Sequence, residues 1–179
     1  TYYLSVILLL IALASIASIL FFHWRTGVPP LPTTRSEAND TIALLHQAKL
    51  PEQAVIYELG CGWGSLVIAL AKAFPQSQIR GIELSPIPYW IARFRTRRMK
   101  NVTLKRGNFY DCDLRDADAV TCYLMIQPML RLADFLDKML RPGAAVVTVT
   151  FWFRNRKARA IRKGKGWRGE VALYLWPAN

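Results

Sequence analysis

Three glycines at alternate positions follow an apolar run in the first half of the chain. The stretch from 58 to 64 reads Glu-Leu-Gly-Cys-Gly-Trp-Gly, and it separates the run AVIYEL from the helical pattern SLVIALAKAF. Glycine permits sharp backbone turns and lets a ligand come close where a Cβ atom would block it. The first turn of a helix offers unpaired N–H donors and a partial positive charge. The stretch therefore predicts a strand–turn–helix unit that can hold a carboxylate.

Short apolar runs alternate with helical patterns over most of the chain. The runs span 54–59, 77–84, 101–106, 117–124 and 144–153. Strand and helix in alternation predict an α/β fold with a parallel sheet and right-handed crossovers. The last run, 170–176, follows only a basic loop, so we expect it to be antiparallel at the sheet edge. A short helix is expected at 41–49, before the first strand.

The first 24 residues differ from the rest in composition. Residues 2–22 carry no charge, and a helix of that length spans about 30 Å, the thickness of a bilayer core. We therefore predict a transmembrane helix at 1–24, a proline-rich linker at 25–36 and a globular domain at 37–179. The alternatives are a cleaved signal peptide, whose apolar region is usually shorter, and a buried core helix, which usually has a polar stripe.

Basic residues dominate the chain after this segment. The sequence has 24 Lys and Arg against 12 Asp and Glu, a net charge of +12. By the positive-inside rule this predicts a single-pass membrane protein with its domain in the cytoplasm. Residues 93–100 and 154–168 concentrate the excess charge, and we expect them to lie on anionic lipid, with RNA as the competing partner.

Cysteine and histidine give no sign of a metal site. The three cysteines form no C-x-x-C pair, which argues against a zinc site or a disulfide framework and fits a reducing compartment. The two histidines have no spacing that suggests a ligand set or a catalytic triad. We expect no metal.

The glycine stretch resembles motif I of the class I S-adenosylmethionine-dependent methyltransferases. Its spacing is G-x-G-x-G, with an acid two residues before the first glycine. A nicotinamide-binding fingerprint would read G-x-G-x-x-G. The resemblance covers about residues 37–176. It implies a Rossmann-like fold with strand order 3-2-1-4-5, a C-terminal antiparallel strand and helices on both faces of the sheet.

The resemblance also implies a set of residues that bind S-adenosylmethionine. An acid at the end of strand two accepts hydrogen bonds from ribose hydroxyls, and Glu83 has that position. Asn108 stands where the family often has an aspartate for the adenine amino group, and its side-chain carbonyl can accept that bond. Phe109 would pack against the adenine ring. The full predicted set is Glu58, Gly60, Cys61, Gly62, Gly64, Glu83, Leu84, Asn108 and Phe109.

The residues after strand four bear on the methyl acceptor. The run YLMIQPM at 123–129 has no N-P-P-Y or D-P-P-Y, which argues against a nucleic-acid base. It is similar to a segment of the membrane-anchored lysine methyltransferases that modify the ATP synthase c-subunit or the ADP/ATP translocase, and of their prokaryotic relatives. Residues 83–86 with Trp90 and Arg93 resemble the E-L-N-P-x-x-x-W-x-x-R stretch of that subfamily. Two positions depart from its G-x-G-D-G-R, because Trp63 and Ser65 replace the aspartate and the arginine.

A lysine acceptor must lose its proton before it can attack, because its reference pKa is about 10.4. An apolar channel lined by aromatic residues would favour the neutral amine. We expect Tyr110, Tyr123 and Pro128 to line the channel, with Trp152 as a further candidate, and Gln127 to orient the amine. Tyr123 and Trp152 suit a plain core role equally well.

Three functions follow from these patterns. The first is methylation of a lysine on a membrane protein at the cytoplasmic face, where tethering would raise the effective concentration of the substrate. The second is methylation of a lipid or a lipophilic small molecule. The third is a non-catalytic membrane-anchored module that binds S-adenosylmethionine or RNA, a reading that the bulky Trp63 in the glycine loop favours.

Overall fold

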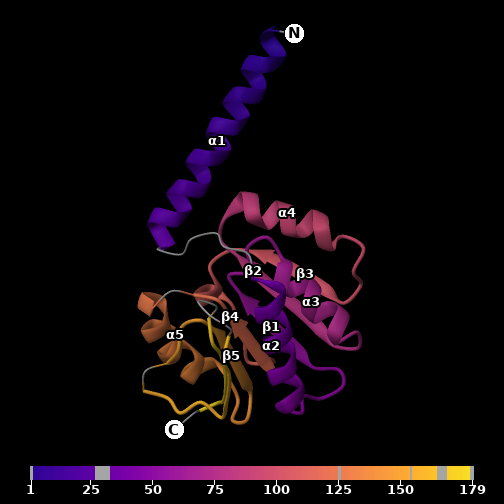
Figure 1. Cartoon of the computed structure of the whole chain (residues 1–179), viewed down its shortest axis with the longest axis vertical. Coiled ribbons are helices and arrows are strands. Elements are labelled where there is room, and N and C mark those ends of the chain that lie inside the picture. The colour runs from indigo at the N-terminus through magenta and orange to yellow at the C-terminus, as the bar shows by residue number, and fades with distance from the viewer. Residues whose placement is uncertain (1, 27–32, 125, 154, 165–168, 178–179) are drawn as a thin grey trace.

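A mixed sheet forms the centre of the molecule (Figure 1). The computed structural model describes residues 2–26, 33–124, 126–153, 155–164 and 169–177. The strands are β1 (Val55–Leu59), β2 (Gln78–Glu83), β3 (Val102–Arg106), β4 (Ala119–Cys122), β5 (Ala145–Val149), β6 (Ala160–Arg162) and β7 (Val171–Leu175). The helices are α1 (Tyr2–Thr26), α2 (Arg35–Gln47), α3 (Ser65–Ala73), α4 (Pro86–Thr96) and α5 (Ile126–Met139), with a 3₁₀ turn η1 (Phe109–Asp111).

The strand order is β3-β2-β1-β4-β5-β7-β6, which confirms the predicted order of the first five strands. These five are parallel, with Tyr57 opposite Arg80 on β2 and opposite Val120 on β4. Strand β7 is antiparallel to β5, as predicted. The prediction that this strand lies at the sheet edge was wrong, because β6 forms in the basic loop and pairs with the outer side of β7.

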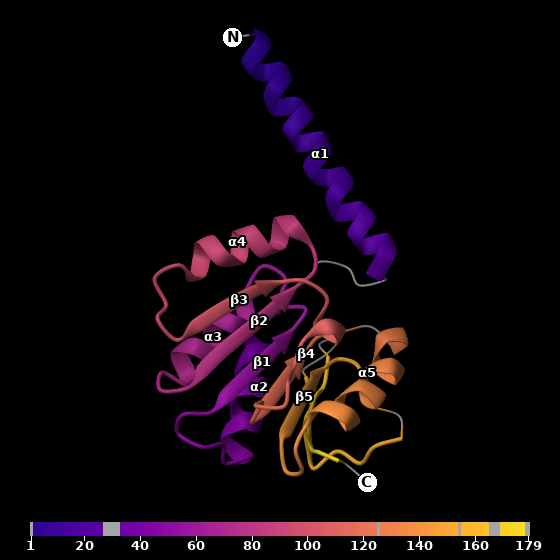
Figure 2. The same ribbon diagram turned by 180° about the vertical axis from the view of Figure 1, so that it is seen from behind.

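Helices cover both faces of the sheet (Figure 2). One face packs on α2 and α3 through Leu44, Leu45, Leu66 and Leu70, all buried. The other packs on α5 through the buried Leu132 and Leu136. Helix α4 lies beside β2 and β3. Because every parallel crossover brings the chain back to the same edge, the loops after β1 to β4 meet at the carboxyl ends of the strands.

Helix α2 begins earlier than its apolar spacing predicted. The Thr34 hydroxyl accepts a hydrogen bond from the Glu37 backbone N–H at 3.3 Å, and the Glu37 carboxylate accepts one from the Thr34 N–H at 2.8 Å. This reciprocal capping box fixes the start of the helix at Arg35. Helices α1 and α2 thus occupy both ends of the segment 25–36 that was predicted as a linker, and the division into three segments stays a prediction.

Helix α1 extends away from the sheet (Figures 1 and 2). Its leucine and isoleucine side chains are exposed over most of its length, among them Leu4, Leu8 and Ile11. Within the part of the chain that the structure describes, no helix combines the length and the hydropathy needed to cross a membrane. The prediction of a transmembrane helix at 1–24 is therefore not supported, although the segment does form a helix.

Candidate cofactor site at the carboxyl ends of the strands

The glycine loop turns sharply and is fastened to the neighbouring strand. The N–H groups of Gly60 and Cys61 both donate to the Ile82 carbonyl, at 2.9 and 3.0 Å. Gly62 has a φ of +51°, and a Cβ atom there would point into open space. Gly64 has a φ of +77°, and its Cβ atom would lie 3.0 Å from the Ala92 Cβ atom on α4. Both positions require glycine, the first for the approach of a ligand and the second for the packing of α4.

Glu83 joins this loop to the start of α4. Its Oε2 atom accepts a hydrogen bond from the Gly62 N–H at 2.8 Å, and its Oε1 atom accepts one from the Ser85 N–H at 2.7 Å. The side chain is only 8% exposed. Each carboxylate oxygen has a second lone pair, so Glu83 can hold the loop and still accept hydrogen bonds from a ligand.

Glu58 lies beneath the loop and is 3% exposed. Among the described residues its Oε2 atom has no hydrogen-bond partner. Burial, with a smaller contribution from the charge of Glu83, holds the pKa of Glu58 well above its usual range. The Cys61 side chain packs in the core below the loop, where burial also raises the pKa of its thiol. Any role of Cys61 in binding a cofactor must therefore come from its backbone.

The loop after β3 lies beside Glu83, because the Gly107 N–H donates to the Glu83 carbonyl at 3.0 Å. The Asn108 Oδ1 atom accepts a hydrogen bond from the Tyr110 N–H at 3.1 Å and caps η1. The oxygen predicted to bind adenine is thus partly engaged, with one lone pair left. The next residue, Phe109, is partly buried, and its ring centroid lies 4.4 Å from that of Tyr110. Leu84, which follows β2, is also partly buried.

The predicted acceptor residues separate into two groups. The Tyr110 ring lies 5.3 Å from the Phe135 ring, and its centroid lies 4.3 Å from the guanidinium carbon of Arg131. Burial raises the pKa of Tyr110. Tyr123 packs instead against the core cluster that α2 and α3 cover. Trp152 packs against the cluster on the α5 face, which fits its core reading.

Gln127 and Pro128 belong to the first turn of α5, and their side chains lie outside the described residues. Their predicted contacts with the acceptor, like the binding roles of the other predicted residues, stay predictions. The described residues contain no group of three or more His, Cys, Asp or Glu placed to hold a metal ion.

Two arginines at this end of the sheet were not anticipated. The Arg95 Nη1 atom donates to the Trp63 carbonyl at 2.5 Å and lies 3.4 Å from the Ser65 hydroxyl, so α4 is fastened to the glycine loop. Arg131 on α5 covers the Tyr110 ring. No local pattern indicates either contact, because each joins segments distant in the sequence.

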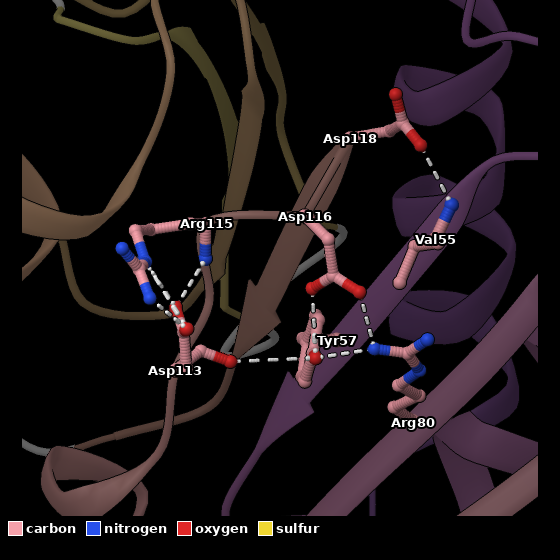
Figure 3. A network of polar contacts seen from close by, with 7 residues as sticks. All are labelled: Val55, Tyr57, Arg80, Asp113, Arg115, Asp116 and Asp118. Atoms are coloured by element: carbon pink, nitrogen blue, oxygen red, sulfur yellow. Dashed lines mark hydrogen bonds and ion pairs between the residues drawn. The ribbon is translucent and has the colours of Figure 1, made fainter.

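The amino ends of β1 and β4 carry a different polar cluster (Figure 3). The Arg80 Nη1 atom lies 2.6 Å from the Asp116 Oδ2 atom and donates to the Tyr57 hydroxyl at 2.6 Å. That hydroxyl donates to the Asp116 Oδ1 atom at 3.0 Å. With Asp113 and Arg115, which form their own ion pair, these residues line an open hollow of about 590 Å³.

Comparison with known proteins identifies the family. The model of the ANTKMT methyltransferase domain matches residues 58–160, from the acid before the glycine loop into β6. The chain belongs to this family. A protein-lysine N-methyltransferase of Saccharolobus islandicus is 27% identical over 152 residues, which are 83% of this chain and 94% of the relative. This chain is an S-adenosylmethionine-dependent methyltransferase.

Solved structures of methyltransferases share the fold of this enzyme. The structure of an RNA methyltransferase from Salinibacter ruber, in complex with S-adenosyl-L-homocysteine, has a TM-score of 0.74. It is 26% identical in sequence, and the match covers 83% of this chain and 95% of that one. A precorrin-6y C5,15-methyltransferase from Geobacter metallireducens has a TM-score of 0.61 at 17% identity, which shows the fold alone.

The residues of the glycine loop fit S-adenosylmethionine. The buried Glu58 Oε2 atom lacks a partner among the described residues, and the ammonium group of the methionine moiety is a cation that suits a carboxylate. The first amides of α3 would hold the carboxylate of that moiety, and Glu83 would hold the ribose hydroxyls. The bound cofactor supplies an activated methyl group on a sulfonium, which is the only chemistry it needs to bring.

Proposed function

We propose that this methyltransferase acts on the side-chain amine of a lysine in a protein. The similarity to a protein-lysine N-methyltransferase supports this acceptor, because it extends over 83% of this chain and 94% of the relative. A domain of the ANTKMT family over residues 58–160 supports it as well.

Transfer to lysine needs a neutral amine in line with the methyl group. The lone pair of Nζ forms the new N–C bond as the C–S bond breaks, and the product ammonium then releases a proton to water. The protein must therefore keep the amine unprotonated and exclude water around it. The partly buried pair of Tyr110 and Phe135 provides an aromatic surface next to the loop after β3 that can disfavour the charged ammonium form.

The proposed setting is the cytoplasmic face of a membrane, with an acceptor on a membrane protein. Two observations support it: α1 exposes apolar side chains over most of its length, and the whole chain carries a net charge of +12. A cationic protein is attracted to the anionic cytoplasmic leaflet. Tethering enzyme and substrate to one surface raises their effective concentration.

RNA is the second candidate acceptor. The Salinibacter ruber structure with a TM-score of 0.74 is described as an RNA methyltransferase, and cationic segments suit a phosphate backbone. The absence of N-P-P-Y and D-P-P-Y after β4 argues against a base nitrogen as acceptor. A lysine acceptor therefore stays the leading proposal.

Incorporation of a radiolabelled methyl group distinguishes these acceptors. The enzyme is incubated with labelled S-adenosylmethionine and a membrane extract from cells that lack it, and the label is followed into protein, lipid and RNA fractions. We expect protease-sensitive label that appears as methyllysine after acid hydrolysis. Label that is removed by ribonuclease, or that enters the lipid extract, would overturn the lysine proposal.

Two variants control this experiment. Glu83→Ala should abolish the label, because Glu83 joins the cofactor loop to β2 and α4. Asp116→Ala, at the opposite end of the sheet, should keep most of it. Binding of S-adenosylmethionine by the wild-type protein, measured by calorimetry, separates an absent acceptor from a failed cofactor site.

A further inference from the structure

The outer face of α4 combines exposed apolar side chains with positive charge. Trp90 is 58% exposed, Phe94 64% and Ile91 39%. The opposite face is buried and holds Tyr89 and Ala92. Residues three to four apart share one side of a helix, so Trp90 and Phe94 lie together on the outside. This arrangement leaves a large apolar surface in water unless something covers it.

All the charged residues in the sequence around this face are basic. From 84 to 110 the chain has five arginines and two lysines and no aspartate or glutamate. Four of them, at 93, 95, 97 and 98, belong to α4 or the turn after it, and Lys100 follows. Lys105 and Arg106 are exposed on β3, the edge strand beside α4. The surface that covers α4 must therefore be anionic as well as apolar.

The aromatic rings on α4 are paired with guanidinium groups. The Arg97 guanidinium carbon lies 3.8 Å from the centroid of the Phe94 ring, and that of Arg93 lies 5.7 Å from the Trp90 ring. One face of Phe94 is thus already occupied, which disfavours stacking with a nucleic-acid base. A ring that enters the interfacial layer while its arginine stays at the phosphates suits a lipid headgroup region.

The position of helix α1 also favours a lipid surface as the partner of α4. Both views show α4 at the end of the domain from which α1 extends (Figures 1 and 2), and Cα atoms of the two helices approach within 8 Å. Both helices thus expose apolar side chains at the same end of the domain. Apolar side chains exposed on two neighbouring helices, with cations beside those of α4, suit the interface of an anionic bilayer.

We propose that α4 is a second membrane contact, and that it docks on an anionic bilayer with Trp90, Ile91 and Phe94 in the interfacial layer and its arginines at the phosphates. This docking fixes the orientation of the catalytic domain, because Arg95 and Ala92 of the same helix contact the glycine loop. It shares with the proposed function only the membrane setting, since methyl transfer to a soluble lysine peptide needs no bilayer.

The test reports on α4 alone, so that any adsorption of the exposed apolar side chains of α1 to a vesicle does not decide its outcome. An environment-sensitive fluorophore is attached to Ile91→Cys, and for comparison to Glu52→Cys in an exposed loop. The three native cysteines are buried and stay unlabelled in the folded protein. Each labelled protein is mixed with vesicles of phosphatidylcholine, with or without phosphatidylglycerol, and with single-stranded RNA.

We expect a several-fold rise and a blue shift of the emission at position 91 with the anionic vesicles only, and no change at position 52. The pair Arg98→Glu and Lys100→Glu should remove most of that rise. The matched pair Lys49→Glu and Lys138→Glu changes the net charge equally on other surfaces and should leave it. Calorimetric binding of S-adenosylmethionine confirms that all variants are folded.

Three results would overturn the proposal: no response at position 91 to anionic vesicles, an equal response at position 52, or equal loss from the two charge-reversal pairs. A response at position 91 to RNA without a response to vesicles would assign α4 to nucleic acid instead. Loss of docking with normal methylation of a soluble lysine peptide would leave the proposed function intact.

Discussion

The acidic side chains at the two ends of the sheet have different partners. At the carboxyl ends, Glu58 and Glu83 are buried and, among the described residues, pair with no arginine or lysine. At the amino ends, Asp116 and Asp118 form ion pairs with Arg80 and Arg141. An acid already paired with a guanidinium has little left to offer a ligand, whereas Glu83, held by two backbone N–H groups, keeps further lone pairs for hydrogen bonds.

This difference suits the carboxyl ends to ligand binding and the amino ends to a structural role. The ion pairs at the amino ends lie at least partly in water, where such pairs contribute about 0–1 kcal/mol each. The buried Glu58 at the other end costs free energy, because burial disfavours its charged form. Buried acids with shifted pKa values are found most often at sites that bind a ligand or carry out chemistry.

Cofactor affinity should respond to Glu83 and not to Asp116. Glu83→Ala removes the anchor of Gly62 and the predicted hydrogen bonds to the ribose, and each charge-assisted hydrogen bond contributes about 1.5–3 kcal/mol. We expect affinity for S-adenosylmethionine to fall roughly 100-fold by calorimetry, and Asp116→Ala to change it less than about twofold. Equal losses in the two variants would remove the distinction between the ends.

Alanine should cost more at Gly64 than at Gly143. Both glycines have positive φ, +77° and +89°, so each substitution strains the backbone by about 1–2 kcal/mol. Only at Gly64 would the new Cβ atom press on Ala92, at 3.0 Å, which adds about 1 kcal/mol or more of overpacking. Urea unfolding measures the difference, and a larger cost at Gly143 would contradict the packing of α4 on the loop.

The pH dependence of stability should have opposite signs at the two ends. The raised pKa of Glu58 means that the folded protein keeps a proton that the unfolded chain loses, so this contribution falls as pH rises above about 4.3. Arg115 lowers the pKa of Asp113 to about 2, so that contribution is present above about 3.9 and is lost as pH falls.

Two isosteric variants test these signs by urea unfolding at a series of pH values. Glu58→Gln should flatten the decline of stability in the range above the ordinary glutamate pKa. Asp113→Asn should change only the acidic limb. Parallel curves for wild type and Glu58→Gln would show that Glu58 is not buried as a neutral acid.

The smallest effect should come from the pair of Arg80 and Asp116. Their side chains are 36% and 52% exposed, so solvent screens the interaction. A double-mutant cycle of Arg80→Ala and Asp116→Ala should give a coupling of about 0.5–1 kcal/mol that decreases with added salt. A coupling several times larger, or one that salt leaves unchanged, would mean that this end is more than a solvated ion pair.

Local patterns predicted the parts of the structure that local physics determines. The apolar runs gave strands β1 to β5 and β7, and the acids at 58 and 83 with the glycines between them predicted the loop that the structure shows. The start of α2 was also readable, because Thr34 and Glu37 have the spacing of a capping box, but apolar spacing alone placed it at residue 41.

Contacts between segments that are distant in the chain could not be predicted from the sequence. Arg80, Tyr57 and Asp116 come together through strand pairing, with no pattern at any one of them. Strand β6 has three residues in a cationic loop and forms because β7 offers it an edge. The exposed side of α4 could not be predicted for the same reason, since the side that faces inward is the one whose Ala92 packs on Gly64.

Hydrogen–deuterium exchange with and without S-adenosylmethionine tests most directly which end of the sheet holds the cofactor. We expect slower exchange on binding in the segments 58–66, 83–85 and 107–110, and no change at 113–118 beside the amino-end cluster. Protection at 113–118, or none in the glycine loop, would contradict this expectation.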